Sequence, residues 1–207
     1  MHALRLLNTV VLCAGVLFGV EMHLSAALAS VGANGHWPSH QRELVVVDRT
    51  GQKSWQEATR WAVQQWQQAG ADVRMSWTTE PGPCEPDGER ISVCLSTAAE
   101  LGDQAIPGVQ GLVDPQVDQM QHTEASTIQV CSDCRVDGRR RRVIATHELG
   151  HVLGLQHSER KTSVMYHTGG SQSPDPEDLA DLRAIYAHTD PPPRCGVFNL
   201  RIGGVCL

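Results

Sequence analysis

Alternation of apolar and polar positions predicts a β-sheet in the central part of the chain. The β-branched run at residues 44–47 and the alternating stretches at 73–77, 90–95 and 126–131 are each bounded by turn-forming residues, as strands are. Residues 111–113 form a shorter extended piece between two proline-containing turns. These segments predict four strands and a short fifth one.

Apolar residues repeating every three or four positions predict three helices. The first extends from Ser54, as N-cap, to Gly70, as stop, and its tryptophans and alanines form one stripe that we expect to pack in the core. The second covers residues 142–154, and the third covers 176–187 and has an acidic first turn. The four arginines at 139–142 are interpreted as a solvated loop before the second helix.

The N-terminal segment is typical of a secretory signal peptide. Arg5 precedes an apolar run at residues 6–20, and small residues follow up to Ala29, so we expect cleavage after Ala29. The run is shorter than the roughly 20 residues of a bilayer-spanning helix, which makes a retained membrane anchor the weaker alternative. Residues 1–29 therefore predict export, to the periplasm or the extracellular space.

Composition indicates one globular domain with a short tail. The 207 residues are 41% hydrophobic and 19% charged, with a formal net charge of −6, which excludes a disordered chain and offers no basic field for nucleic acid. We expect a single folded domain over residues 30–190, a cysteine-containing tail over 191–207, no membrane span after cleavage, and a monomer.

Six cysteines follow the leader, and an even count in an exported chain predicts up to three disulfides. Six cysteines allow 15 pairings, so the connectivity stays open. Spacing groups them as Cys84 with Cys94, Cys131 with Cys134, and Cys195 with Cys206. Zinc or redox chemistry at Cys131-x-x-Cys134 is the alternative to a structural disulfide, but the chain has no second such pair.

The second predicted helix carries the candidate chemistry. His147 and His151 are four residues apart, so both imidazoles can face one ion. Glu148 is rotated by about 100° from His147 and can reach a water on that ion. Gly154 can adopt a positive φ that ends the helix and returns the chain, so that His157 can supply a third ligand.

Three neutral imidazoles without a fourth protein ligand are typical of catalytic rather than structural zinc. Zinc lowers the pKa of a bound water and polarises a carbonyl, while Glu148 can take the proton of that water and pass it to a leaving amine. These parts predict a hydrolase, and most directly a peptidase. Three histidines without a ligand function are the plain alternative.

The pattern H-E-x-x-H-x-x-G-x-x-H at residues 147–157 resembles the metzincin zinc endopeptidases, and Ser163-Val164-Met165-Tyr166 is similar to their Met-turn. Tyrosine directly after methionine, and the final helix, resemble the matrixins. The resemblance implies an α+β fold, sandwich-like, with a twisted and mostly parallel sheet, an active-site helix and a C-terminal helix. It makes residues 30–190 a metzincin-like catalytic domain.

The resemblance also implies a role for individual residues. It assigns one catalytic zinc to His147, His151 and His157, the general base to Glu148, and the apolar floor of the site to Met165. Substrate, a protein or an extended peptide, would pair with an edge strand and meet the S1′ wall, at Gly111, Leu112, Val113 and Tyr166.

Two departures from the matrixin pattern limit these expectations. His167 stands where matrixins usually have proline, so the side-chain preference of the S1′ pocket stays open. No structural zinc or calcium loop is recognisable: His122 stands by itself with only Asp118 and Glu124 nearby in the sequence. Calcium is therefore possible without support from a motif.

The tail offers a further alternative. Pro193-Arg194-Cys195-Gly196-Val197 is similar to the inhibitory cysteine sequence of matrixin prodomains, and a Cys195 thiolate could occupy the open zinc position. A Cys195–Cys206 disulfide is the plain alternative. Two other functions also stay open, a zinc hydrolase of another substrate class and a non-catalytic zinc-binding interaction module.

Overall fold

The computed structural model describes residues 35–102, 110–190, 201–202 and 205–206. The expected signal peptide at 1–29 and most of the expected tail at 191–207, including Cys195, lie outside these residues. Among the helices that are described, none has the length and apolar character needed to cross a membrane.

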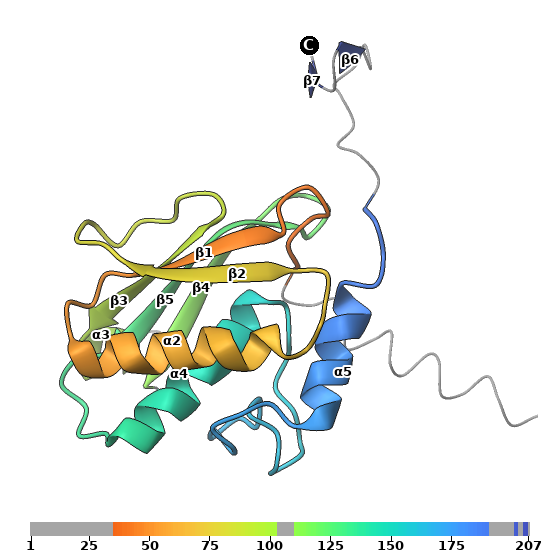
Figure 1. Ribbon diagram of the computed structural model, residues 1–207. Coiled ribbons are helices and arrows are strands. Elements are labelled where there is room, and N and C mark those ends of the chain that lie inside the picture. The colour runs from red at the N-terminus through yellow and green to blue at the C-terminus, as the bar shows by residue number, and fades with distance from the viewer. Residues whose placement is uncertain (1–34, 103–109, 191–200, 203–204, 207) are drawn as a thin grey trace, which may run out of the picture. The chain divides into compact units, whose positions relative to one another are not determined.

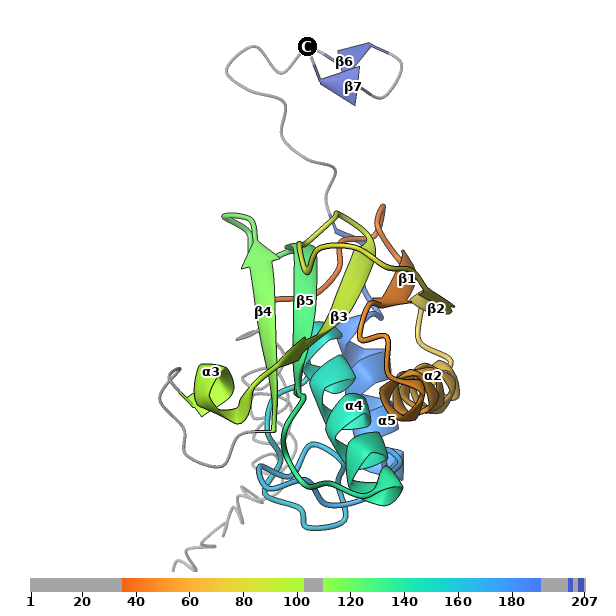
Figure 2. The ribbon, with the colours of Figure 1, turned by 90° about the vertical axis from the view of Figure 1, so that its left-hand side faces the viewer.

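The sheet has five strands in the order β2-β1-β3-β5-β4. Their bounds are β1 Glu43–Asp48, β2 Arg74–Thr79, β3 Arg90–Ser96, β4 Gly111–Val117 and β5 Thr123–Cys131. All neighbouring strands are parallel except β4, which runs antiparallel to β5 at one edge (Figure 2). The expected α+β architecture with a mostly parallel sheet is confirmed, and β4 and β5 are longer than their alternation predicted.

Three helices lie on one side of this sheet (Figures 1 and 2). They are α2 Lys53–Gln67, α4 Gly138–Val152 and α5 Pro176–Ile185. A short α3, Ala98–Gly102, follows β3 and was not predicted. The core lies between the sheet and the helices. Trp55 of the predicted stripe is 1% exposed and packs there as expected, whereas Trp61 is half-buried. Trp66 of α2, also 1% exposed, joins the core as well.

The start of α2 differs from the prediction. The helix begins at Lys53, and its N-cap is Gln52, whose side chain makes no capping hydrogen bond, rather than Ser54. Thr50 takes part in this turn because its hydroxyl accepts the Gln52 N–H at 3.2 Å. Gly70 follows the helix with a φ of +62°, as expected of a residue that ends it.

The interpretation of residues 139–142 as a loop is wrong, because α4 begins at Gly138 and contains all four arginines. The Asp137 side chain caps the helix by accepting the Arg140 N–H at 2.7 Å. The guanidinium of Arg142 lies 4.7 Å from the centre of the Trp61 ring of α2, which is cation–π geometry. The arginines therefore extend the helix and cover the tryptophans of its neighbour.

Among the described residues two disulfides are present, and both match pairs that spacing favoured. Cys84–Cys94 joins the loop before β3 to that strand, and Cys131–Cys134 closes the turn after β5. The latter bond excludes zinc at Cys131-x-x-Cys134, since both thiols are used. Arg201–Ile202 (β6) and Val205–Cys206 (β7) form a separate short antiparallel pair.

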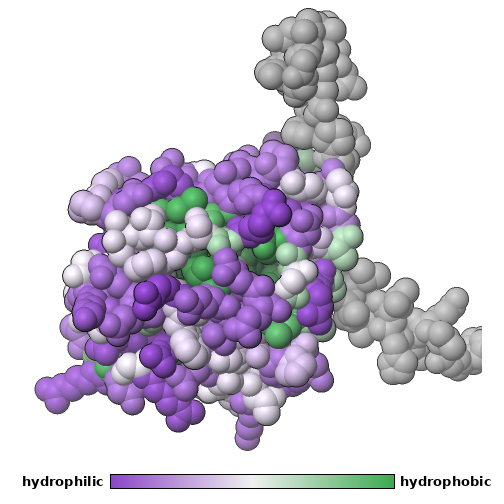
Figure 3. All heavy atoms as spheres, viewed as in Figure 1, coloured by the Kyte–Doolittle hydropathy of each residue, from purple (hydrophilic) through white to green (hydrophobic). Residues whose placement is uncertain are grey.

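The face seen in Figure 3 is mostly hydrophilic, and the hydrophobic residues gather over its centre. Among the described residues, the large hydrophobic side chains that are exposed are Val117 and Met120. Both belong to the β4 strand and the turn that follows it.

Candidate metal centre

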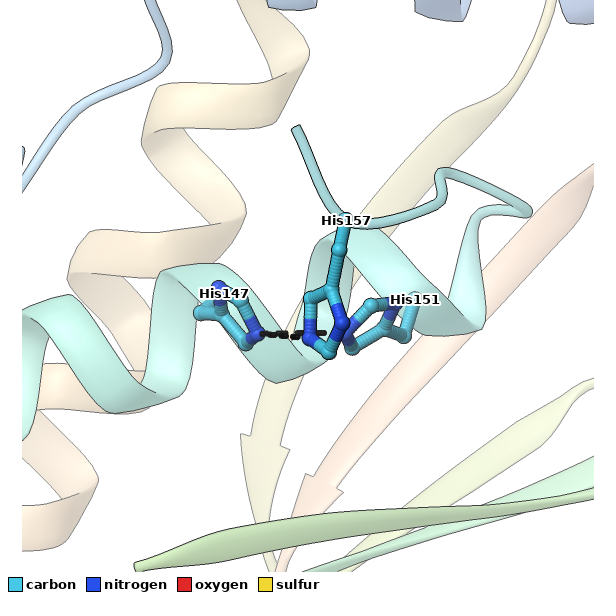
Figure 4. A group of neighbouring side chains, drawn as sticks. All are labelled: His147, His151 and His157. Atoms are coloured by element: carbon cyan, nitrogen blue, oxygen red, sulfur yellow. Dashed lines mark hydrogen bonds between the residues drawn. The ribbon is translucent and has the colours of Figure 1, made fainter. Parts of the chain in front are cut away.

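Three histidine side chains converge beside α4 (Figure 4). His147 and His151 come from the helix itself, and His157 comes from the segment that follows it. The Nε2 atom of His147 lies 3.1 Å from Nε2 of His151 and 3.2 Å from Nε2 of His157. The spacing predicted from the sequence is therefore realised as one compact group.

The other ring nitrogens fix how these side chains present themselves. Nδ1 of His147 lies 2.8 Å from the Val164 carbonyl, and Nδ1 of His151 lies 2.8 Å from the Leu155 carbonyl. A carbonyl can only accept, so each Nδ1 carries the hydrogen and each Nε2 presents a lone pair. Two lone pairs facing each other repel unless a cation lies between them.

The spacing of these nitrogens fits zinc. A Zn–N bond of about 2.0–2.1 Å in a tetrahedron places its ligand atoms about 3.3 Å apart, close to the observed separations. Among the described residues this group contains three ligands and no fourth. The donor set can hold zinc and keep one position open, as catalytic sites do.

Burial keeps the two helical imidazoles neutral. It lowers the pKa of His147 to about 4 and that of His151 to about 3, and the neighbouring imidazoles lower both further. His147 is 8% exposed whereas His157 is on the exposed side of the group. Neutral imidazole is the form that binds a metal, and a substrate can approach from the side of His157.

Gly154 makes the turn that brings His157 back to the helix. Its φ is +96°, and its N–H donates to the His151 carbonyl at 2.9 Å. Two features exclude a side chain at this position. A Cβ would lie 2.5 Å from the carbonyl oxygen of Gly35, and residues with a side chain rarely adopt the left-handed backbone conformation. The expected helix end at this glycine is observed.

Glu148 lies between the histidine helix and the edge strand. It is 8% exposed, and burial raises its pKa to about 8. A Cβ on Gly111, the first residue of β4, would lie 2.6 Å from the Glu148 Oε1 atom. The carboxyl group therefore packs directly against the start of the strand that sequence analysis assigned to substrate.

The Met-turn packs beneath the same helix. Met165 is 1% exposed, and a Cβ on Gly150 would lie 2.4 Å from its sulfur, so the absence of a side chain at Gly150 lets the methionine approach α4. The Met165 carbonyl accepts the Ser158 N–H at 2.8 Å. That bond ties the turn to the residue after the third histidine.

Asp178 of α5 holds this turn in place, a role that sequence analysis did not assign. Its Oδ1 accepts the Ser163 hydroxyl at 2.5 Å, and its Oδ2 accepts the Val164 N–H at 3.0 Å. Val164 in turn supplies the carbonyl that orients His147. The only sequence signal was the capping box of Asp175 and Asp178, which marks a helix start rather than a link to the histidines.

Arg140 is a second residue that sequence analysis missed. Its guanidinium donates to the Gln110 side chain at 2.7 Å and to the Thr168 carbonyl at 2.8 Å. It thereby joins the residue before β4 to the segment after the Met-turn. Nothing in the run of four arginines distinguishes this one, because its partners are distant in the sequence.

The residues assigned to substrate binding lie on two elements. Gly111, Leu112 and Val113 begin β4, and no described strand pairs with the outer edge of β4. Tyr166 is half-buried after the Met-turn, and its ring centre lies 4.3 Å from that of His167. The structure places both elements next to the helix that carries the histidines.

His122 does not stand alone, which corrects the expectation from the sequence. Its Nδ1 lies 3.3 Å from an Asp118 carboxylate oxygen, as the sequence suggested, but its Nε2 lies 3.3 Å from Asp190. Glu124 is exposed. Together with His36, also close to Asp190, His122 forms a second group with metal-ligand spacing among the described residues.

Comparison with known proteins decides the family. Residues 39–187 match the family model described as Matrixin. The chain belongs to the matrixin family. Human matrix metalloproteinase-26 is 33% identical over 141 residues, which cover 64% of this matrixin and 47% of the relative. Cat (Felis catus) matrilysin is 44% identical over 48 residues, 21% of this chain and 18% of the relative. This matrixin thus spans about half or less of the curated relatives it matches.

Solved structures show weaker likeness. Myroilysin has a TM-score of 0.48 at 11% identity, covering 75% of this chain and 97% of its own. Archaemetzincin from Methanopyrus kandleri has a TM-score of 0.49 at 14% identity, covering 74% and 97%. Both scores are below one half, so the fold of this matrixin rests on its own sheet order and helices.

Proposed function

We propose that this matrixin is a zinc-dependent endopeptidase that hydrolyses peptide bonds in proteins or extended peptides. The observation that carries this proposal is the convergence of three Nε2 atoms, with separations of 3.1 and 3.2 Å from that of His147, beside a buried carboxyl. In this proposal His147, His151 and His157 hold the ion and Glu148 acts as general base.

Zinc bound by the three histidines supplies a Lewis acid that polarises the scissile carbonyl and acidifies water. The remaining work falls to side chains of the protein. Glu148 accepts a proton from the attacking water at its carboxylate and later donates it to the departing amine. Its burial against Gly111 excludes bulk water from the carboxylate, and a nearby cation favours its ionised form.

An extended substrate would bind along β4. The outer edge of this antiparallel strand is unpaired in the described sheet, and its first residue touches Glu148, so a peptide added there would pass the base. Main-chain pairing of this kind is tolerant of side chains. Tyr166, half-buried after the Met-turn, would then shape the pocket that selects the residue following the cleaved bond.

Export is part of the same proposal. The disulfides Cys84–Cys94 and Cys131–Cys134 support an oxidising compartment. Residues 1–29 have the order of a signal peptide. Sequencing the N-terminus of the exported protein tests this, and we expect it to begin at Ser30.

The decisive experiment compares the purified protein with its Glu148→Ala variant. Both should bind zinc at His147, His151 and His157, while cleavage of casein at internal bonds falls by about a thousandfold in the variant, the middle of the range for loss of a general base. Glu159→Ala is the matched control, because Glu159 is an exposed glutamate two residues after His157 in the sequence. If the parent binds zinc at the triad and cleaves nothing, the module serves binding instead of catalysis.

A further inference from the structure

A second histidine cluster lies where the two ends of the domain meet. One residue precedes β1, one precedes β5, and two follow α5. We call this cluster the terminal histidine site; its members are His36, His122, His188 and Asp190. None of the four belongs to the candidate catalytic group.

The main chain brings the first two members together. The His36 N–H donates to the Gln121 carbonyl at 3.3 Å, and the His36 carbonyl accepts the Thr123 N–H at 2.8 Å. This short bridge lays the segment before β1 beside the start of β5. The centres of the His36 and His122 rings are 5.1 Å apart.

The donor atoms of His36, His122 and Asp190 lie within metal-ligand distance of one another, and His188 adjoins two of them. The Asp190 Oδ1 atom lies 3.2 Å from His36 Nε2, 3.3 Å from His122 Nε2 and 2.9 Å from His188 Nε2. The His36 and His188 Nε2 atoms are themselves 3.0 Å apart. Hydrogen bonds alone satisfy this arrangement poorly, because only one hydrogen can lie between two nitrogens and three rings compete for one oxygen.

The separations match the edges of a zinc tetrahedron. Ligand atoms at about 2.0–2.1 Å from zinc stand about 3.3 Å from one another in that geometry, and the four measured separations range from 2.9 to 3.3 Å. Imidazole nitrogen and carboxylate oxygen are both zinc ligands. His36, His122 and Asp190 supply three ligands in place, and His188, whose Nε2 lies within 3.0 Å of two of the donor atoms, would supply the fourth by turning toward the ion, which would close the site as in structural zinc centres.

Neighbouring groups orient the ligands, as they do in established metal sites. The Asp118 carboxylate lies 3.3 Å from Nδ1 of His122 and accepts its hydrogen, which leaves Nε2 for the ion. The second carboxylate oxygen of Asp190, Oδ2, accepts the Ser39 N–H at 2.7 Å and the Ser39 hydroxyl at 2.8 Å. The Arg42 guanidinium lies 3.5 Å from the same oxygen.

We propose that a second zinc ion binds at the terminal histidine site. Bound there, it joins the chain before β1, the start of β5 and the chain after α5 into one cross-link. Such a link stabilises the folded domain because it binds the folded state and not the unfolded chain. Its ligands span residues 36–190, so it closes nearly the whole described domain.

Zinc counting tests the proposal on the purified full chain. The protein is loaded with zinc, freed of unbound metal by gel filtration, and analysed for zinc per chain. We expect two zinc ions in the parent, one in the double variant His36→Ala/His188→Ala, and one in His147→Ala/His151→Ala. His40→Ala is the matched control, since His40 is an exposed histidine in the same segment as His36, and it should retain two.

A second variant guards against misfolding. Asp190→Asn keeps the shape of the side chain but removes the charge of the ligand, and we expect one zinc ion with an unchanged far-ultraviolet circular dichroism spectrum. Thermal unfolding gives an independent readout. Zinc at a hundredfold excess over its Kd should raise the Tm of His147→Ala/His151→Ala by about 5 °C or more. It should leave unchanged the Tm of the quadruple variant, which also carries His36→Ala and His188→Ala.

The outcomes separate the two proposals. One zinc ion in the parent and none in His147→Ala/His151→Ala would mean that the terminal histidine site is only a hydrogen-bonded cluster, and the inference would be overturned. One zinc ion in the parent that persists in His147→Ala/His151→Ala, and disappears in His36→Ala/His188→Ala, would support the terminal site and contradict the proposed catalytic one.

Discussion

The two histidine groups of this matrixin are built in opposite ways. The candidate catalytic group takes its three histidines from residues 147–157, on one helix and the turn that follows it. The terminal histidine site takes its ligands from three segments between residues 36 and 190. The first can be read from a sequence motif because helix geometry aligns His147 with His151 and the glycine turn returns the chain at His157. The second exists only once the domain has folded.

The groups also differ in how completely they surround an ion. Three ligands leave one position for substrate chemistry, whereas four close the tetrahedron and favour a structural role. The two groups approach each other at Gly154, whose missing side chain makes room for the Gly35 carbonyl and, at 3.6 Å from the Cβ position, for the His36 side chain. A substitution of Gly154 is therefore expected to disturb both histidine groups.

Chelation should separate the two groups most strongly. We expect a strong chelator to abolish casein cleavage completely in a fast phase, because the open three-ligand group releases its ion first, and to lower Tm in a slower second phase. A zinc-sensitive dye, an activity assay and thermal melts taken over time measure this. Loss of activity and of Tm in one common phase would contradict the distinction, and added zinc should restore both.

Asp178→Ala should affect the catalytic group through the Met-turn. The change leaves the Ser163 hydroxyl and the Val164 N–H without their buried acceptor, so we expect the free energy of unfolding to fall by about 3 kcal/mol. Urea denaturation measures it. Asp181→Ala, an exposed acid on the same helix, should change stability by less than about 0.5 kcal/mol. If Asp178→Ala and Asp181→Ala lowered the free energy of unfolding equally, the proposal that Asp178 positions the Met-turn would be contradicted.

Gly154→Ala should disturb both groups at once. The left-handed backbone at φ +96° and a Cβ only 2.5 Å from the Gly35 carbonyl oxygen should lower the free energy of unfolding by about 2 kcal/mol. We also expect weaker zinc binding at both groups, measured by competition with a zinc dye. Gly102→Ala is the control, since a Cβ there meets nothing within 4 Å. Weakening of only one group would show that they are independent.

Asp175→Asn should have the smallest effect, and one that depends on pH. Burial alone would raise the pKa of Asp175, but the Asp178 N–H and the Arg160 guanidinium outweigh it and lower that pKa. A lowered folded-state pKa contributes stability above the unfolded pKa of about 3.9, and this is lost as pH falls through the folded value. Asparagine keeps the helix cap, so only the charge changes.

We expect Asp175→Asn to lower the free energy of unfolding by about 1 kcal/mol at pH 7, with the difference beginning to shrink near pH 4 and vanishing only below the lowered folded-state pKa. Urea denaturation of both proteins across this pH range measures it. A difference that is the same at low and neutral pH would mean that the Arg160 ion pair contributes nothing. Neither histidine group should lose zinc at pH 7.

Local patterns were sufficient for most of the fold. Strands β1, β2 and β3 lie where alternation placed them, within two residues at either end, because a half-buried strand imposes that period. The start of α4 was misplaced by about one turn because charged residues were read as loop. Arg141 and Arg142 remain helical where their guanidinium groups cover Trp55 and Trp61, and no local pattern contains those partners.

By itself, the sequence determined the histidine spacing on one helix face, the glycine turn and the positions of most strands, because each depends on the geometry of a short segment. Only the tertiary structure decided which distant residues meet. Asp178 reaches the Met-turn, Arg140 joins Gln110 to Thr168, and Asp190 gathers three histidines. Such contacts depend on how the sheet and the helices pack. The number of residues between two positions does not show whether their side chains are close in space.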